Sequence, residues 1–478
     1  MIPFLSDVLF HYPATATQRT IRQGFTLALY VAGALFIAHF FNFGDVQLVA
    51  NDWMKEYMYL NALREAQLTQ TIPWSWSKPY YHETGKLLAN PEIILTPHII
   101  LLRWLSNGSF VILHVIAFYS LGFYGCVKIA ARYSMGLVSF FLLWLLFNLN
   151  GFITAHLGIG HLQWVGYYLL PAFLLLFTTL HERTRANPMR PQPTSLYISL
   201  LLFFLILNGS FHIAIWCMLL MLISVWWDHR LFFNVVYAVV LAIVLGAFRL
   251  LPAALFFPES PSFTSGYPSL SVLLDALTSI RGRHHPPMGG AFGDLMWWEY
   301  NIHIGFAALI LLAIGLFAAI KRRVTLFPAP LIAASLTMLV LSLGDVYALI
   351  AESGLPFSTV QRVSTRFIAI PLLVFIIISI RGLDLLLKDD RVYWKKAVLL
   401  GIPFIIFELH TQTAHWRVDH LEKLHKPVTK PELTLLSDPS PSYSKITYIS
   451  WLTSKSALVV ILLALALRYK INKQRKGT

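Results

Sequence analysis

Long apolar runs alternate with shorter polar segments along most of this chain. The runs cover residues 24–41, 109–131, 135–150, 164–180, 196–207, 211–226, 231–248, 304–320, 331–343, 367–380, 398–407 and 457–467. Several approach the roughly 20 residues that an α-helix needs to cross a hydrocarbon core. The pattern predicts an all-α, polytopic membrane protein with about twelve transmembrane helices.

The first apolar run follows a segment that carries Arg19 and Arg22. This order resembles a secretory signal peptide, but no small-residue cleavage site follows the run and the preceding segment is long. We therefore expect an uncleaved anchor helix.

The composition agrees with a membrane protein. Hydrophobic residues make up 57% of the 478 residues and charged residues only 13%, whereas soluble domains carry about 25% charged residues. Both cysteines, Cys126 and Cys217, lie inside apolar runs, where a thiol acts as a small packing group. Neither a disulfide framework nor a thiol metal site is indicated.

The distribution of lysine and arginine predicts the orientation. If the N-terminus is cytoplasmic, each short cytoplasmic loop of the twelve-span arrangement is basic, as the positive-inside rule requires. Both termini are then cytoplasmic, in the inner membrane of a bacterium. The net charge of +14 is explained by these loops and by anionic lipid, without nucleic-acid binding.

The same arrangement places the longer polar segments on the periplasmic side, where we expect any chemistry. They are residues 42–108, 151–163, 249–303 and 410–448, with a shorter one at 344–366. We divide the chain into a module of residues 1–386, with periplasmic loops 42–108 and 249–303, and a C-terminal part of residues 387–478, with loop 410–448 and a basic tail.

Ordered short motifs in these segments resemble the GT-C superfamily of membrane glycosyltransferases, in particular its bacterial YfhO-like branch. In the first loop they are Asp52, Leu63-Arg64-Glu65, Ile72-Pro73-Trp74 and Leu88-Ala89-Asn90-Pro91. Further motifs follow in order: Asn150-Gly151-Phe152 with His156 and His161, Asn208-Gly209 with His212, Leu250-Leu251-Pro252, Trp298-Glu299-Tyr300, and Arg362 with Arg366-Phe367. The chain departs from the branch where Asn51-Asp52 replaces Gly-Asp, so Asp45 of Gly44-Asp45 is an alternative catalytic residue.

The resemblance implies a GT-C fold with a helical first periplasmic loop, and transfer of a sugar from a polyprenyl-phosphate donor to a glycan, lipid or protein acceptor of the cell envelope. It makes Asp52 the base that activates the acceptor hydroxyl in an inverting attack. Cationic groups would stabilise the lipid phosphate that leaves. The substrate-binding candidates are Arg64, Glu65, His156, His161, Glu299, Arg362 and Arg366. Arg249, Arg281 and Arg283 are second-choice candidates for stabilising the leaving phosphate. A divalent cation such as Mg or Mn is compatible, with Asp52, His156 and Glu299 as candidate ligands.

Other interpretations remain open. Asp52 is also a favoured residue type for capping the helix that follows it, and interfacial arginines commonly anchor helix ends. A transporter or flippase of a lipid-linked or small substrate would also have many spans. A non-catalytic scaffold in a membrane complex, with a membrane-protein partner, would keep the packing motifs and not depend on Asp52.

Overall fold

The protein is all-α, as predicted. The computed structural model describes residues 7–69, 75–76, 86–186, 192–257, 266–281, 295–353, 361–389, 392–423, 435–436 and 441–476. Within these ranges there are eighteen α-helices, α2 to α19. The one strand pair among them is antiparallel and joins β1 (Ser75–Trp76) to β2 (Leu435–Leu436).

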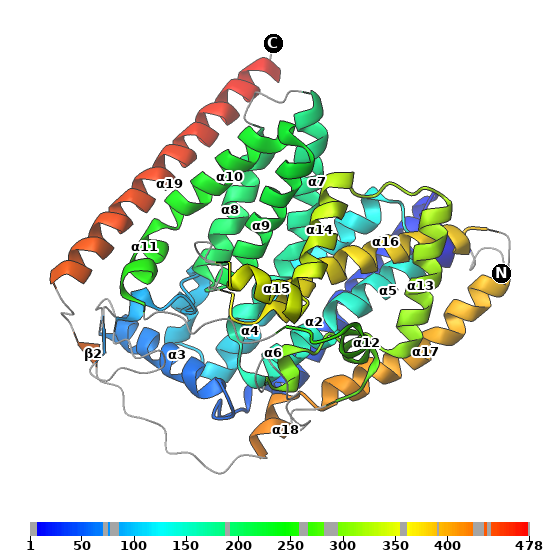
Figure 1. The fold of residues 1–478 in the computed structure, drawn as a ribbon, viewed down its shortest axis with the longest axis horizontal. Helices are drawn as coiled ribbons and strands as arrows, with labels where there is room; N and C mark the ends of the chain where they lie inside the picture. The colour runs from blue at the N-terminus through cyan, green and yellow to red at the C-terminus, as the bar shows by residue number, and fades with distance from the viewer. Residues whose placement is uncertain are drawn as a thin grey trace.

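Some successive helices are joined by short connections and others by long ones (Figure 1). Their bounds are α2 Ala16–Phe40, α3 Trp53–Leu68, α4 Asn107–Arg132, α5 Leu137–Asn148, α6 Gly151–Ile159, α7 Leu170–Ala186, α8 Pro193–Leu207, α9 Phe211–Trp227, α10 Phe232–Leu245, α11 Ala247–Phe256, α12 Leu270–Thr278, α13 Phe306–Lys321, α14 Ala329–Leu341, α15 Gly344–Ala351, α16 Ala369–Leu387, α17 Val392–Ala414, α18 Val418–Lys423 and α19 Pro441–Lys476. Short 3₁₀ turns include η4 (Leu162–Leu169), η6 (Trp297–Glu299) and η7 (Ser364–Ile368).

The prediction of about twelve spans is wrong. Six helical segments in the described part of the chain are long and apolar enough to cross a membrane: 16–40, 107–132, 137–159, 162–186, 364–387 and 441–463. A seventh is the pair α10 and α11, which is bent by 75° around Gly246. The apolar runs of α8, α9, α13 and α14 do form helices, but each is shorter than 18 residues. Apolar composition predicted helix at these positions correctly and predicted membrane crossing too often.

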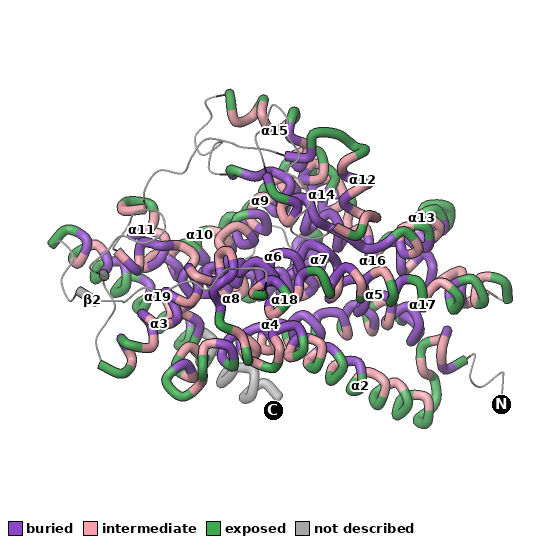
Figure 2. Tube along the Cα trace, turned by 90° about the horizontal axis from the view of Figure 1, so that it is seen from below, coloured by how far each residue is buried: buried purple, intermediate pink, exposed green. Residues whose placement is uncertain are grey.

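Buried residues concentrate along α5, α6, α7 and α16 (Figure 2). Glycines allow α13 and α16 to approach closely, because a Cβ at Gly382 would collide with the carbonyl oxygen of Gly315. Small residues at such crossings are the usual means by which membrane helices come into backbone contact. By contrast, α2 is largely exposed along its length.

Basic residues of distant segments meet at one end of the helical body. The carbonyl oxygens of Ser134 and Met135 accept hydrogen bonds from Lys388 and Arg22, each at 2.7 Å.

In Figure 1 the C-terminal end of α19 lies on the side of the molecule opposite α3, β2 and α18. The assignment of these two sides to cytoplasm and periplasm stays a prediction, as does the domain division at residue 386.

Candidate functional site

Asp52 lies at the start of α3, at the end of a strained turn. The two residues Leu48 (φ 57°) and Asn51 (φ 53°) adopt left-handed backbone conformations, which are uncommon for residues other than glycine. The amide of Asp52 donates to the carbonyl oxygen of Ile159 at 3.0 Å. Gly160, at φ +98°, permits this contact, because a Cβ there would collide with the backbone nitrogen of Trp53.

Asp52 occupies the N-cap position of α3, but its side chain makes no capping hydrogen bond. Its Oδ2 instead lies 3.1 Å from Nε2 of His161. The side chain is 32% exposed, so the carboxylate is both held in place and accessible. Capping, the alternative role suggested by the sequence, does not account for this residue.

A second histidine continues the contact inward. Nδ1 of His161 lies 2.8 Å from Nδ1 of His156, which is 1% exposed. A neutral histidine has one donor and one acceptor nitrogen. If His161 donates from Nε2 to Asp52, its Nδ1 accepts from His156, and the three side chains form a single chain of hydrogen bonds.

Lys55 sits among three carboxylates at the buried side of Asp52. Its Nζ is 2.5 Å from Glu92, 3.6 Å from Asp52 and 3.8 Å from Glu56. Lys55 and Glu56 are almost fully buried. We refer to Asp52, Lys55, Glu56 and Glu92 as the Asp52 cluster.

Burial and these charges shift the pKa values of the cluster. Burial alone would raise the pKa of Asp52, but its hydrogen bond to His161 and the charges of His161 and Lys55 outweigh burial and lower it. Burial is also the largest influence on Glu56, and it raises the pKa of that carboxyl to about 8. The pKa of Lys55 is raised well above its ordinary value because Glu92, Glu56 and Asp52 together outweigh its burial. The cluster therefore lowers the pKa of Asp52 and raises that of Glu56, so the two carboxyl groups differ in their tendency to ionise.

The Asn90-Pro91 segment carries Glu92 into the cluster. Arg249, fully buried at the bend between α10 and α11, donates to the carbonyl oxygens of Pro91 at 3.1 Å and Ile93 at 2.8 Å. Glu92 also accepts from Gln163 Nε2 at 3.2 Å. Arg249 thus fixes the backbone on both sides of Glu92 and does not face the site itself.

Glu299 and Arg366 form a second, bidentate ion pair. The guanidinium donates from Nε at 2.8 Å and from Nη2 at 2.6 Å. Burial alone would raise the pKa of Glu299, but the Arg366 charge and hydrogen bonds lower it to about 2.

Trp164 joins the ion pair to the histidines. Its ring lies 5.1 Å from the Arg366 guanidinium carbon and stacks on His156 with centroids 4.7 Å apart. Ring stacking and cation–π contact of this kind fix the relative positions of the groups. The structure therefore brings together five predicted site residues: Asp52, His156, His161, Glu299 and Arg366.

Other predicted residues lie elsewhere. Arg64 is about three helical turns from Asp52, where it donates to the carbonyl oxygens of Leu102 and Leu105. Glu65, Asp45 and Arg362 are exposed, and Arg281 pairs with Asp275 at 2.6 Å. The Ile72-Pro73-Trp74 motif and Arg283 lie outside the described residues.

Lys55, Glu56 and Glu92 were missed by sequence reasoning. A local signal existed for two of them, because residues three and four positions after Asp52 share its helix face. The only sequence signal for Glu92 was its position directly after Asn90-Pro91.

The residues predicted as metal ligands do not form a metal site in the described part of the chain. In the described ranges, no three His, Cys, Asp or Glu side chains are arranged to hold a metal ion. Asp52 and His156 both contact His161, and Glu299 is engaged by Arg366. We derive no chemistry through a metal.

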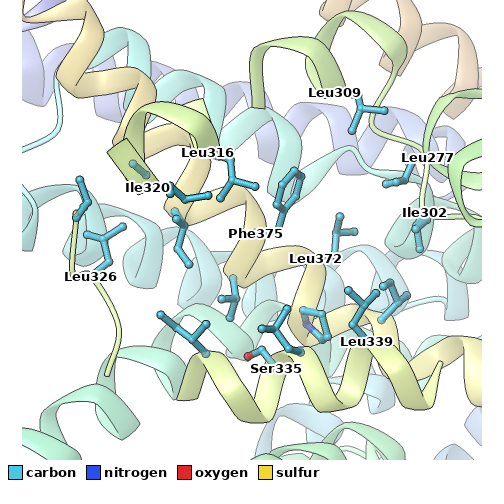
Figure 3. Close-up of a pocket in the computed structure, with 18 of the residues that line it drawn as sticks. Leu277, Ile302, Leu309, Leu316, Ile320, Leu326, Ser335, Leu339, Leu372 and Phe375 are labelled. Atoms are coloured by element: carbon cyan, nitrogen blue, oxygen red, sulfur yellow. The ribbon is translucent and has the colours of Figure 1, made fainter. Parts of the chain in front are cut away.

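An apolar groove has lining residues on the segments that carry Glu299 and Arg366. It has a volume of about 630 Å³ and lies between α13, α14 and α16. Figure 3 shows Leu309 and Leu316 of α13, Leu339 of α14, and Leu372 and Phe375 of α16 turned into it. At one end it is lined by Ile302 and Ile368, close in sequence to Glu299 and Arg366, and at the other by Arg323 and Thr325.

Comparison of the chain with models of known protein families, with curated proteins and with solved structures gives no match in any of the three. The helices and their apolar composition show a multi-pass membrane protein. The glycosyltransferase resemblance remains a prediction.

Proposed function

We propose that the protein transfers a sugar from a polyprenyl-phosphate donor to a hydroxyl group of an envelope acceptor. The observation that carries the proposal is the Asp52 carboxylate, which is ionised, partly exposed and oriented by His161. A positioned carboxylate is the group that such a transfer needs, because an acceptor hydroxyl becomes a good nucleophile only as its proton is removed.

In the proposed reaction, the acceptor oxygen forms a bond to the anomeric carbon while the bond between that carbon and the phosphate oxygen breaks. The hydroxyl proton passes to Asp52, and the polyprenyl phosphate leaves with the bonding electron pair. Attack from the face opposite the leaving group inverts the anomeric configuration. A low pKa is compatible with this role, since the hydroxyl proton becomes acidic as the new bond forms.

The groove between α13, α14 and α16 supports a lipid-linked donor. Its lining is almost entirely apolar, as a prenyl chain requires, and one of its ends lies beside the segments that hold Glu299 and Arg366. Arg362, which is exposed and precedes Ile368 by six positions in the chain, is the candidate for contacting the donor phosphate. Arg366 is engaged by Glu299 and serves to position Trp164 and the histidines.

The test replaces Asp52 with Asn in cells whose envelope glycan depends on this protein. Asp45→Asn is the matched control, because it makes the same change in the same loop at an exposed residue. We expect incorporation of radiolabelled sugar into the glycan to fall by about a hundredfold or more in Asp52→Asn and to be retained in Asp45→Asn, at equal membrane abundance by immunoblot. Full incorporation in Asp52→Asn would refute the proposed base.

A transporter or flippase is the second candidate, favoured by the buried Glu56 beside Lys55. A carboxyl group whose pKa burial raises to about 8 can take up and release a proton near neutral pH. Purified protein in liposomes distinguishes the two functions, because only a transferase releases free polyprenyl phosphate from its donor. A scaffold would leave every glycan unchanged in both variants of the preceding test.

A further inference from the structure

A second cavity, remote from the Asp52 cluster, lies between α2, α4 and α5. It has a volume of about 540 Å³, within the range of roughly 300–1,000 Å³ that is common for ligand pockets. Its walls combine the apolar side chains of Leu27, Phe123 and Val127 with polar ones, among them Tyr30 and Ser120, whose hydroxyl groups are hydrogen-bonded to each other. Arg19, Arg22 and Tyr12 line it near the beginning of α2.

Charge distinguishes this cavity from an ordinary crevice between helices. Arg22 donates to the carbonyl oxygen of Met135 at 2.7 Å and its guanidinium carbon lies 4.7 Å from the ring centroid of Tyr12. Arg19 is exposed. Among the ion pairs of the described residues, none includes Arg19 or Arg22. Two arginines thus line the cavity, and neither forms an ion pair with a carboxylate of the described residues.

The nearest buried carboxylate is already neutralised. Asp384 lies 2.6 Å from both Arg381 and Lys388, and it also accepts from the amide of Gly136. Asp384 attracts Arg22 electrostatically, but its direct ion pairs are with two other cations, so the site retains an excess of positive charge. Arginine binds phosphate well because its planar guanidinium can donate two parallel hydrogen bonds.

The cavity is accessible from the outside of the helical body. The helix α2 is largely exposed along its length, and Leu27, which lines the cavity, is 63% exposed. Arg19 and Arg22 lie in the first two turns of α2, while Ala131 lies in the last turn of α4. The arginines are therefore at the end of two candidate spans, the depth at which a lipid headgroup lies.

We infer that this cavity binds one anionic glycerophospholipid, with its phosphate on Arg19 and Arg22 and an acyl chain against Leu27, Phe123 and Val127. The site is independent of the proposed transferase activity. It would anchor the exposed helix α2 to the rest of the helical body through the bound lipid.

The test measures lipid binding to delipidated protein by native mass spectrometry, with phosphatidylglycerol and phosphatidylcholine as probes. We expect one phosphatidylglycerol to bind selectively. In the double variant Arg19→Gln/Arg22→Gln its affinity should fall roughly thirtyfold, because two interfacial charges are lost. Arg185→Gln, the same change at an exposed arginine outside the cavity, should leave the affinity unchanged.

Leu27→Trp provides a second test if the double variant does not fold. It keeps both arginines and fills the cavity at an exposed position, so phosphatidylglycerol binding should be lost. Binding retained in folded Leu27→Trp, equal binding of phosphatidylcholine, or an equal loss in Arg185→Gln would each overturn the inference. Displacement of the lipid by inorganic phosphate at equal concentration would instead identify a free-phosphate site and overturn the lipid assignment.

Discussion

The carboxylate of Asp52 and the imidazole of His161 lie 3.1 Å apart, although 109 residues separate them in the chain. The contact joins the start of α3 to the turn between α6 and η4. It gives Asp52 a fixed direction. In the proposed transfer it would also offer a route by which a proton received by the carboxylate could leave.

His161→Ala should lower kcat of the proposed transfer by about a hundredfold, with a smaller change in KM. The loss of the hydrogen bond should also raise the pKa of Asp52, which that bond lowers. Activity should therefore decline at a higher pH on the acidic side than in the wild type. Steady-state kinetics across pH measure both effects, and an unchanged acidic limb would exclude His161 as the partner of the base.

Glu56→Gln should remove a pH dependence of stability. The pKa of Glu56 in the folded protein is raised to about 8 by burial, above its unfolded value of about 4.3. The folded state therefore binds more protons than the unfolded state between these values. The contribution of Glu56 to the free energy of unfolding is therefore fully present below the unfolded pKa. It decreases as the pH rises and is lost as the pH passes the folded pKa.

We thus expect the Tm of the wild-type protein in detergent to fall by roughly 2 °C or more between mildly acidic and alkaline pH, and the Tm of Glu56→Gln to fall less. Glu65→Gln is the control, because Glu65 is exposed on the same helix. If the Tm of Glu56→Gln falls with pH as steeply as that of the wild type, the pH dependence does not come from the raised pKa of Glu56.

Removing one partner of the Glu299–Arg366 pair should destabilise the protein strongly. Either Glu299→Gln or Arg366→Gln leaves a buried charge without its counterion, which costs about 3–5 kcal/mol. The double variant should recover part of this loss, because no unpaired charge remains. Free energies of unfolding of the wild type, the two single variants and the double variant give the coupling energy between the two residues. Arg362→Gln is an exposed control. If the losses of the single variants simply add in the double variant, the two side chains do not interact.

Gly160→Ala should disturb the start of α3. The residue has φ +98° and an added Cβ would collide with the nitrogen of Trp53, so the backbone must shift and move Asp52. We expect a lower Tm and a marked loss of the proposed activity. Gly24→Ala is the matched control, because no atom lies within 4 Å of a Cβ built there, and a similar loss in both variants would refute the steric argument.

Ser335→Phe should obstruct the groove between α13, α14 and α16, which Ser335 lines. The apparent KM for a polyprenyl-phosphate sugar should rise while kcat changes little, because uniform binding of the lipid chain is lost. Val340→Phe serves as control, since Val340 is 48% exposed on the same helix and does not line the groove. An unaltered KM in Ser335→Phe would remove the groove as the carrier site.

The helices could be predicted from sequence, but their relation to the membrane could not. Every apolar run lies on at least one helix, because burial and helix formation both follow from local composition. A break such as the 75° bend at Gly246 depends on what packs around it. The number of spans was overstated mainly by the runs that lie on α8, α9, α13 and α14, because these helices are only 13 to 17 residues long.

The site was predictable only in part, for the same reason. Asp52 and His161 could be named from motifs, whereas their contact depends on the packing of α3 against the turn at Gly160. Lys55 and Glu92 meet because Arg249 positions the segment around Glu92. No short-range pattern contains that information.

The C-terminal part of the chain closes onto the loop that carries Asp52. Glu422 accepts hydrogen bonds from the amides of Gln47 and Leu48, and the Tyr443 hydroxyl accepts from the amide of Leu88. The strand β2 pairs with β1 in the same loop. The conformation of the first loop is thus completed by residues that lie 355 to 375 positions later in the chain, so a ribosome must have added them before Asp52 reaches its final environment.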